Sequence, residues 1–324
     1  MSRAATVGSE GVAVDLRTRV GSVALANPVM TASGTAGHGA ELAAYLELAD
    51  LGAVVVKSLS AEPWAGNRAP RLVPLLAAGG MLNSVGLQNP GVDEWLSTEL
   101  PGLARTGATV VASIWGFTVD QYRRAAATIA RAGPGAIVAV EANISCPNIE
   151  DRQQMFAHSV EGVQEAISAA VDGLGGTVPL WAKLSPNVTD LPALAAAASD
   201  AGAEAVTLIN TVMGMAIDPA TGAFRLGGGG GGLSGPAIHP VAVRAVFECR
   251  AALPDTPIIG VGGVSSGVDA AELLAAGADA VQVGTATFAD PRAPARVLAE
   301  LAGWCRSQRI STIDELKGRA HVRH

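Results

Sequence analysis

A thiol between two carboxamides is the feature of the sequence that most directly suggests chemistry. In the motif N-I-S-C-P-N, Cys146 is flanked by Asn143 and Asn148. Such carboxamides can hold a planar ring rich in amide groups while the thiol reaches one face of that ring. A lone cysteine is more often a small buried apolar residue, and Cys249 and Cys305, in predicted helices, fit that interpretation. Cys146 instead follows a predicted strand among polar neighbours, which is typical of a reactive thiol.

Two lysines directly follow apolar runs. Lys57 follows A-V-V-V and Lys183 follows P-L-W-A. Because burying an ammonium group without a partner is costly, each lysine predicts an anionic ligand or an electron-rich ring beside it. A structural ion pair, with Glu141 or another carboxylate, is the alternative for either lysine.

Glycines follow the last two apolar runs of the chain. Gly262–Gly263 and Gly284–Thr285 would give backbone amides close access to a phosphate. Tight turns are the alternative, but the two sites together favour a phosphorylated cofactor or substrate. The glycine run at 227–232 is followed by no G-K-[ST] motif, so we expect a mobile lid segment there and not a nucleotide-binding loop.

The apolar runs also indicate the elements that position these residues. Short continuous runs predict buried parallel strands at 28–32, 53–57, 109–114, 137–143, 179–184, 205–210, 257–262 and 280–284. Segments with helical spacing lie at 41–51, 119–131, 160–171, 191–201, 240–253, 268–276 and 293–306. Glycines at 52, 202 and 277 predict left-handed helix caps before strands. This eightfold alternation predicts an α/β fold, a (β/α)8 TIM barrel, and disfavours a doubly wound sheet.

Two connections are too long for plain turns. Residues 58–92 and 211–237 are rich in glycine, proline and asparagine, and we expect them to be extended loops over the mouth of the barrel. Residues 12–25 could form a hairpin across the barrel bottom, and 307–324 form a tail. Since no linker or repeat is found, the sequence predicts one domain over residues 1–324.

Composition narrows the class of protein. Of the 324 residues, 49% are apolar and 16% are charged, and the formal net charge is -7. These values exclude a disordered protein and a nucleic-acid binder with a bulk basic surface. Three cysteines and five histidines form no disulfide framework and no metal-binding motif. Without a membrane-length apolar stretch or a secretory signal, we expect a cytoplasmic protein with no membrane partner.

A series of motifs stands at the predicted strand ends in a recognisable order. The motifs are N-P-V-M-T-A-S-G-T at 27–35, V-V-V-K-S at 54–58, M-L-N-S-V-G-L-Q-N-P-G at 81–91, N-I-S-C-P-N at 143–148, K-L-S-P-N at 183–187, I-N-T at 209–211, G-G-L-S-G-P-A-I at 231–238, G-V-G-G-V at 260–264 and V-G-T-A at 283–286. Over nearly all of residues 12–300 the sequence therefore resembles class 1 dihydroorotate dehydrogenases, the FMN-dependent flavoenzymes of pyrimidine biosynthesis.

The resemblance implies two sets of binding residues at the barrel mouth. FMN would be surrounded by Ser33, Lys57, Ser58, Asn143, Lys183, Ile209, Gly235, Gly262, Gly263, Gly284 and Thr285. Substrate would be held by Lys57, Asn83, Ser84, Val85, Gly86, Leu87, Asn143, Asn148, Asn210 and Thr211.

The resemblance also implies a reaction. Cys146, the catalytic base, would remove a proton from carbon 5 of dihydroorotate while carbon 6 delivers a hydride to FMN, which yields orotate. Lys57 would neutralise the substrate carboxylate or negative charge on the reduced flavin. Two features depart from the family: Ser113 replaces a usual asparagine, which shortens one flavin contact, and residues 149–158 lack the usual glycines of a lid. A related reduced pyrimidine is therefore an alternative substrate.

The residues of these motifs resemble those of the NAD-linked class 1B catalytic subunit more than those of the fumarate-linked homodimeric enzyme. The resemblance thus implies electron transfer to NAD through a partner subunit that carries an iron–sulphur cluster and FAD, with fumarate as the alternative acceptor. We also expect a homodimer of this chain. Two other interpretations stay open. One is a flavin-free barrel lyase or isomerase that uses Lys183 as a Schiff-base amine. The other is an FMN-binding subunit without catalytic activity.

Overall fold

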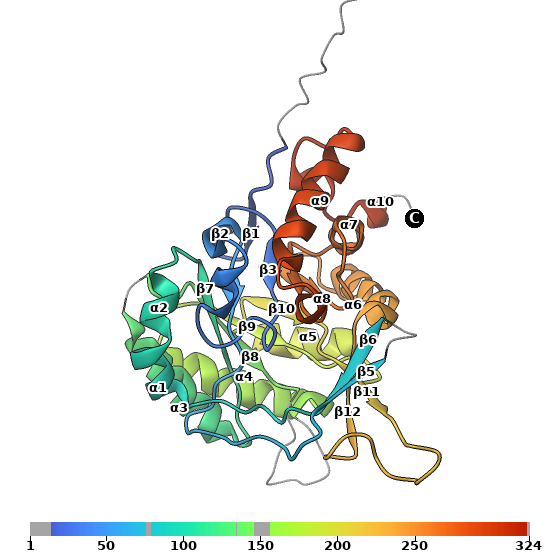
Figure 1. Ribbon diagram of the computed structural model, residues 1–324. Helices are drawn as coiled ribbons and strands as arrows, with labels where there is room; N and C mark the ends of the chain where they lie inside the picture. Colours follow the sequence, from blue (N-terminus) through green and yellow to red (C-terminus); the bar gives the residue numbers. More distant parts are fainter. Residues whose placement is uncertain (1–13, 76–78, 134, 146–155, 323–324) are drawn as a thin grey trace, which may run out of the picture.

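The centre of the molecule is a closed parallel barrel. The computed structural model describes residues 14–75, 79–133, 135–145 and 156–322. Eight strands follow the order β3-β14-β13-β10-β9-β8-β7-β4. They are β3 (Val29–Thr31), β4 (Val54–Val55), β7 (Val110–Ile114), β8 (Ala139–Asn143), β9 (Leu180–Lys183), β10 (Ala205–Leu208), β13 (Ile258–Val261) and β14 (Ala280–Val283). A parallel bridge between Met30 and Ala53 joins β3 to β4 and closes the barrel, which confirms the predicted (β/α)8 fold. Figure 1 shows the helices arranged around these strands.

Helices cover the outside of the barrel. The longer ones are α3 (Val119–Ile129), α4 (Val160–Leu174), α5 (Leu191–Asp200), α6 (His239–Ala252), α7 (Gly267–Ala276) and α9 (Ala293–Ser307). Side chains of Thr118, Ser159, Asp190 and Ser266 accept hydrogen bonds from the first turns of α3, α4, α5 and α7. Gly277, at φ 119°, ends α7 in the left-handed conformation that the sequence predicts.

The segment that connects β3 to β4 differs from the prediction. Residues 41–51 form two short 3-10 helices, η1 (Glu41–Ala44) and η2 (Leu48–Asp50), in place of one α-helix. Gly52 does not cap a helix there. A Cβ added to Gly52 would lie 2.2 Å from the carbonyl oxygen of Asn27, so the close approach of two backbone segments requires glycine. Two further helices, α1 (Val92–Thr98) and α2 (Leu100–Ala104), precede β7.

The barrel interior is apolar at the bottom and polar above. Its lower part packs against the antiparallel hairpin of β1 (Thr18–Val20) and β2 (Val23–Leu25). Because alternate strand residues point inward, Trp181 lies in this apolar layer and Lys183 lies one layer higher on β9. The buried polar side chains of the upper layer are Ser113, Glu141, Lys183, Thr207 and Gln282. The polar layer therefore lies beneath the mouth of the barrel.

The two long connections are not simply loops, as the sequence had suggested. They form an antiparallel sheet of order β11-β12-β6-β5, made of β5 (Leu72–Leu75), β6 (Gly80–Asn83), β11 (Val212–Met215) and β12 (Gly230–Ser234). The expected mobile lid at 227–232 is wrong for its second half, because Gly230–Gly232 belong to β12. A Cβ on Gly231 would lie 2.4 Å from the carbonyl oxygen of Asn83 in β6, so this pairing requires glycine.

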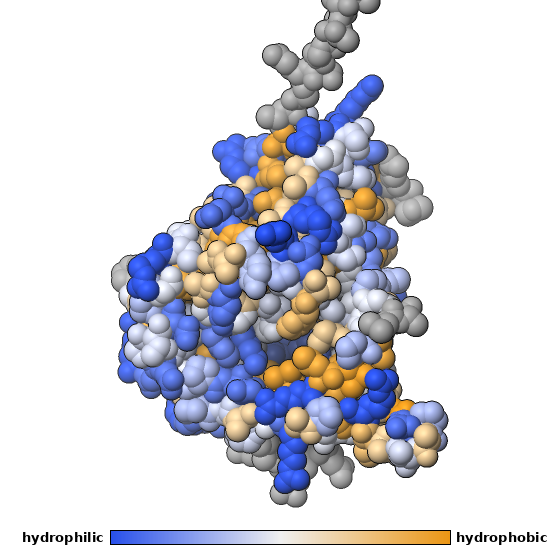
Figure 2. Space-filling model, in the orientation of Figure 1, coloured by the Kyte–Doolittle hydropathy of each residue, from blue (hydrophilic) through white to orange (hydrophobic). Residues whose placement is uncertain are grey.

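The four-stranded sheet also carries exposed apolar side chains. The exposed residues on it and on the adjoining hairpin are Leu72, Met213, Met215, Ile217 and Phe224. Figure 2 shows apolar surface gathered over this part of the molecule, at the lower right of the view. In the part of the chain that the structure describes, no helix has the length and apolar character needed to span a membrane.

Candidate active site

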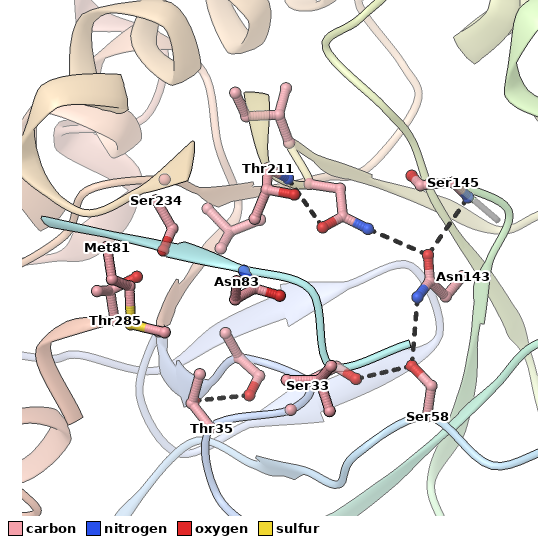
Figure 3. Close-up of a pocket in the computed structure, with 18 of the residues that line it drawn as sticks. Ser33, Thr35, Ser58, Met81, Asn83, Asn143, Ser145, Thr211, Ser234 and Thr285 are labelled. Atoms are coloured by element: carbon pink, nitrogen blue, oxygen red, sulfur yellow. Dashed lines mark hydrogen bonds between the residues drawn. The ribbon is translucent and has the colours of Figure 1, made fainter. Parts of the chain in front are cut away.

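A cavity of about 450 Å³ opens at the carboxyl ends of the barrel strands, beneath the antiparallel sheet. The predicted site residues that line it are Ser33, Lys57, Ser58, Asn83, Ser84, Val85, Gly86, Leu87, Asn143, Lys183, Ile209, Asn210, Thr211, Gly235, Gly262, Gly263, Gly284 and Thr285. Cys146 and Asn148, the other two predicted site residues, lie outside the described residues. Figure 3 shows the polar side chains arranged around this cavity.

Lys57 is a half-buried cation on the cavity wall. Within the described residues its ammonium group makes no hydrogen bond and no ion pair. Burial lowers the pKa of Lys57 below that of an ordinary lysine, and the positive charge of Arg71 lowers it further. Burial, followed by the charge of Lys57, lowers the pKa of His38 to about 4, so this neighbour is neutral at neutral pH. An anion bound in the cavity would supply the missing counter-charge.

Lys183 has a different environment. Its Nζ lies 3.7 Å from Oε1 of Glu141, and the side chains of Lys183 and Glu141 are 6% and 0% exposed. The structural ion pair considered for the two lysines is therefore found at Lys183. Lys183 nevertheless lines the cavity, so it can also contact a bound molecule.

A chain of hydrogen bonds fixes the carboxamides of the site (Figure 3). Nδ2 of Asn143 donates to Oγ of Ser58 at 3.3 Å, and Oδ1 of Asn143 accepts from Nδ2 of Asn210 at 3.1 Å. Ser58 also shares hydrogen bonds with Ser33 at 3.1 Å and with Ser113 at 2.9 Å. Because each amide has a defined orientation, the wall presents fixed donors and acceptors to a planar ring.

One segment of the long connection, the mouth strap (residues 64–71), holds the mouth loop (residues 83–88). Trp64 Nε1 donates to the carbonyl of Gly86 at 2.9 Å. The backbone amide of Asn67 donates to the carbonyl of Val85 at 3.0 Å, and its Nδ2 donates to Oγ of Ser84 at 2.9 Å. Arg71 Nη1 donates to Oε1 of Gln88. The strap therefore fixes the loop that contributes Asn83 to Leu87 to the cavity.

The glycines after β13 and β14 form one corner of the cavity. Gly263 has φ 68°, and a Cβ there would lie 2.7 Å from Cβ of His239. Nδ1 of His239 lies 2.8 Å from the carbonyl oxygen of Gly262 and donates to it, while Nε2 lies 3.2 Å from Glu272. The turn is thus held from α6 and α7, and it exposes backbone without side chains to the cavity together with Gly284.

Comparisons with known proteins agree with this geometry. The family model described as dihydroorotate dehydrogenase matches residues 15–304. The chain belongs to the dihydroorotate dehydrogenase family. A relative from Desulforudis audaxviator is 47% identical over 305 residues, which cover 93% of this chain and 96% of that protein. A second from Citrifermentans bemidjiense is 43% identical over 304 residues, 94% of this chain and 97% of that protein. Both are named dihydroorotate dehydrogenase B (NAD(+)), catalytic subunit.

Ser113 is a position at which the sequence departs from the family pattern, and it lies within the described residues. Its side chain is fully buried, and its hydroxyl bonds to Ser58 behind the cavity wall and does not line the cavity. Most of the altered loop at 149–158 lies outside the described residues.

Some residues of the cavity were missed by sequence reasoning. They are Ala32, Gly34, Thr35, Leu72, Met81, Ser234, Ile238, Val261 and Phe288. Leu72, Met81 and Ser234 come from the unpredicted antiparallel sheet. The short apolar run L-V-P-L at 72–75 was the available signal for β5. Of the described residues, no group of His, Cys, Asp and Glu could hold a metal ion.

Proposed function

We propose that this chain oxidises dihydroorotate to orotate with FMN as its resident cofactor. The observation that carries the proposal is the combination in one cavity of a half-buried Lys57, which has no ion-pair partner among the described residues, with the oriented carboxamides of Asn143 and Asn210. The ammonium matches the carboxylate of dihydroorotate, and the carboxamides match the donor and acceptor edges of its pyrimidine ring. Membership of the family supports the same substrate.

The cavity has features that fit FMN. The corner formed by Gly262, Gly263 and Gly284 suits a phosphate, because a Cβ at Gly263 would be blocked and backbone can approach closely there. Oγ of Ser145 is buried on the cavity wall and has no hydrogen-bond partner among the described residues, so a polar ligand atom could satisfy it. Ser33, Ser58, Asn143, Lys183, Ile209, Gly235 and Thr285 would complete the FMN site.

The mechanism assigns separate tasks to the residues of this chain. Cys146 removes a proton from carbon 5 of dihydroorotate. Bound FMN would supply the acceptor for the hydride that leaves carbon 6. Lys57 binds the substrate carboxylate, and the mouth loop with Asn143 and Asn210 orients the ring so that carbon 5 faces the thiol. The strap and the antiparallel sheet limit the access of water to this side of the cavity.

We further propose that electrons leave through a partner subunit with an iron–sulphur cluster and FAD, and that NAD is the final acceptor. The names of the relatives, which include NAD(+) and catalytic subunit, support this assignment. With three cysteines in the sequence, a four-cysteine iron–sulphur site would have to come from another polypeptide. A homodimer of this chain in the cytoplasm is part of the proposal.

The proposal is tested by cofactor analysis and by product formation. The purified chain is expected to release FMN on denaturation and to form orotate from dihydroorotate with an artificial dye as acceptor. A yellow protein that forms no orotate would instead support an FMN-binding subunit without catalytic activity. A colourless protein that borohydride traps with a carbonyl substrate at Lys183 would support a Schiff-base lyase or isomerase.

A further inference from the structure

A buried carboxylate that the mechanism does not use lies beneath the cavity. Glu141 is on β8, its side chain is 0% exposed, and its Oε1 is 3.7 Å from Nζ of Lys183. Oε1 has no hydrogen-bond partner among the described residues. Among the described residues, Glu141 forms an ion pair with the ammonium group of Lys183, which lines the cavity.

Two neutral side chains hold Glu141 and Lys183 in place. Oε2 of Glu141 accepts from Nε2 of Gln282 at 2.7 Å and from Oγ1 of Thr207 at 3.0 Å. Oε1 of Gln282 accepts from Nζ of Lys183 at 3.3 Å. Gln282 is on β14, which is four strands away from β8 in the sheet order, so it reaches across the barrel interior to bridge both charges. The ammonium is thus held from two sides.

This arrangement has an electrostatic consequence at the cavity. In a buried, low-dielectric layer, a charge acts over several ångströms with little screening. A bound ring above Lys183 therefore experiences a positive charge that Glu141 partly cancels. A buried ion pair adds little to stability compared with apolar packing of the same volume, so folding alone does not account for the pair.

The flavin gains charge when it is reduced. Uptake of two electrons, which dihydroorotate supplies in the proposed reaction, and of one proton leaves the ring with one additional negative charge. A positive group beside the ring stabilises this reduced form, and a carboxylate that cancels the positive charge opposes reduction.

We propose that Glu141 is a positioning residue that holds and partly neutralises Lys183 and thereby lowers the reduction potential of the bound flavin. This inference rests on the proposed function, because it requires FMN above Lys183. It names a residue that acts through Lys183 and need not touch cofactor or substrate.

The test uses the purified full chain with bound FMN. Glu141→Gln removes the charge and keeps the shape, and the midpoint potential of the flavin is measured by anaerobic equilibration with a reference dye. We expect the potential to become more positive. The flavin–dye equilibrium constant should change by about tenfold or more, which corresponds to about 30 mV for a two-electron couple. Thr207→Val is the matched control, since it removes a hydrogen bond to the same carboxylate but no charge, and it is expected to change the equilibrium constant by less than about threefold.

The outcomes separate this inference from the proposed function. A Glu141→Gln variant whose potential equals that of the wild type or of Thr207→Val would overturn the role of Glu141, even if FMN and dihydroorotate oxidation are confirmed. If Glu141→Gln does not retain FMN, Glu141→Asp decides, because it withdraws the carboxylate from Lys183: a more positive potential supports the inference, and an unchanged one overturns it. A wild-type chain without FMN would instead contradict the proposed function.

Discussion

Lys57 is the described cavity residue whose charge most restricts the choice of substrate. Its position after an apolar run already predicted an anionic or electron-rich ligand, and the structure adds that no described side chain neutralises it. The sequence did not show which of the two lysines, Lys57 or Lys183, forms a structural ion pair. A sequence cannot show which of two buried lysines a carboxylate reaches, because Glu141 is 42 positions from Lys183 in the chain and adjacent to it only across neighbouring strands.

Replacing Lys57 by methionine is expected to lower kcat/KM for dihydroorotate by about 10² or more, because the substrate carboxylate loses its buried counter-charge. The FMN content of the variant, measured from the absorbance spectrum, serves as the control for folding. A variant with full FMN content and kcat/KM within about threefold of the wild type would exclude Lys57 from substrate binding.

The lowered pKa of Lys57 predicts a pH dependence. The ammonium is present below its pKa and is lost as the pH rises through it, so kcat/KM should fall on the alkaline side at a lower pH than an ordinary lysine would give. In Lys57→Arg the guanidinium stays charged, and the alkaline fall should move to higher pH. An identical alkaline limb in the two proteins would assign that limb to another group.

Cys146 lies outside the described residues, and its role as base stays a prediction. Cys146→Ala or Cys146→Ser is expected to slow reduction of the flavin by dihydroorotate by about 10² or more while FMN remains bound. Stopped-flow absorbance measures this rate. Near-normal reduction in either variant would contradict the assignment of the base.

At the scale of elements, the sequence predicted the barrel well and the antiparallel sheet poorly. Each barrel strand is a continuous apolar run beside its helix, so the signal is local. Strand β12 pairs with β6, which lies about 150 positions earlier in the chain, and Gly232 faces Asn83 in this pairing. Without knowledge of that partner strand, the glycines of β12 indicate a flexible segment. The mouth strap was missed for the same reason, since its hydrogen bonds to the mouth loop depend on loop geometry and not on any periodicity.

Arg71 joins the mouth strap to the mouth loop and adds positive charge near Lys57. Arg71→Gln is expected to raise KM for dihydroorotate by about tenfold, because the charge-assisted hydrogen bond from Arg71 to Gln88 of the mouth loop is lost. The pKa of Lys57 should rise, which moves the alkaline limb of kcat/KM to higher pH. Arg124→Gln is the matched control: this exposed arginine pairs with Glu62 and Asp120 away from the cavity, and surface pairs contribute about 0–1 kcal/mol. Equal effects of the two substitutions would show that the strap does not position the loop.

In the molecule as a whole, the cavity at the barrel mouth is bordered by three kinds of surface. Fixed carboxamides and hydroxyls line its wall, glycine turns form one corner, and a buried charged layer lies beneath it. The order of motifs along the sequence was sufficient to place the carboxamides and the glycine turns at one mouth, because the carboxyl ends of barrel strands converge. The buried layer beneath the cavity was not predicted. The sheet that covers the mouth could not be predicted in this way.

If electrons leave through a partner subunit, the isolated chain should reduce NAD only slowly. Without the partner subunit, it should form orotate with an artificial dye but reduce NAD at a rate at least about 10²-fold lower, because electron transfer needs the partner's cofactors in place. NADH formation is followed by absorbance with and without dye. Rapid turnover with NAD by the chain alone would contradict the partner requirement, and rapid turnover with fumarate would assign the chain to the other acceptor class.

Oxidation of dihydroorotate by the bound flavin is tested by anaerobic titration of the purified chain with dihydroorotate while the flavin absorbance is recorded. The flavin band is expected to bleach, and one orotate is expected to form for each flavin reduced. A flavin band that persists in excess dihydroorotate, in a folded protein that carries FMN, would contradict it.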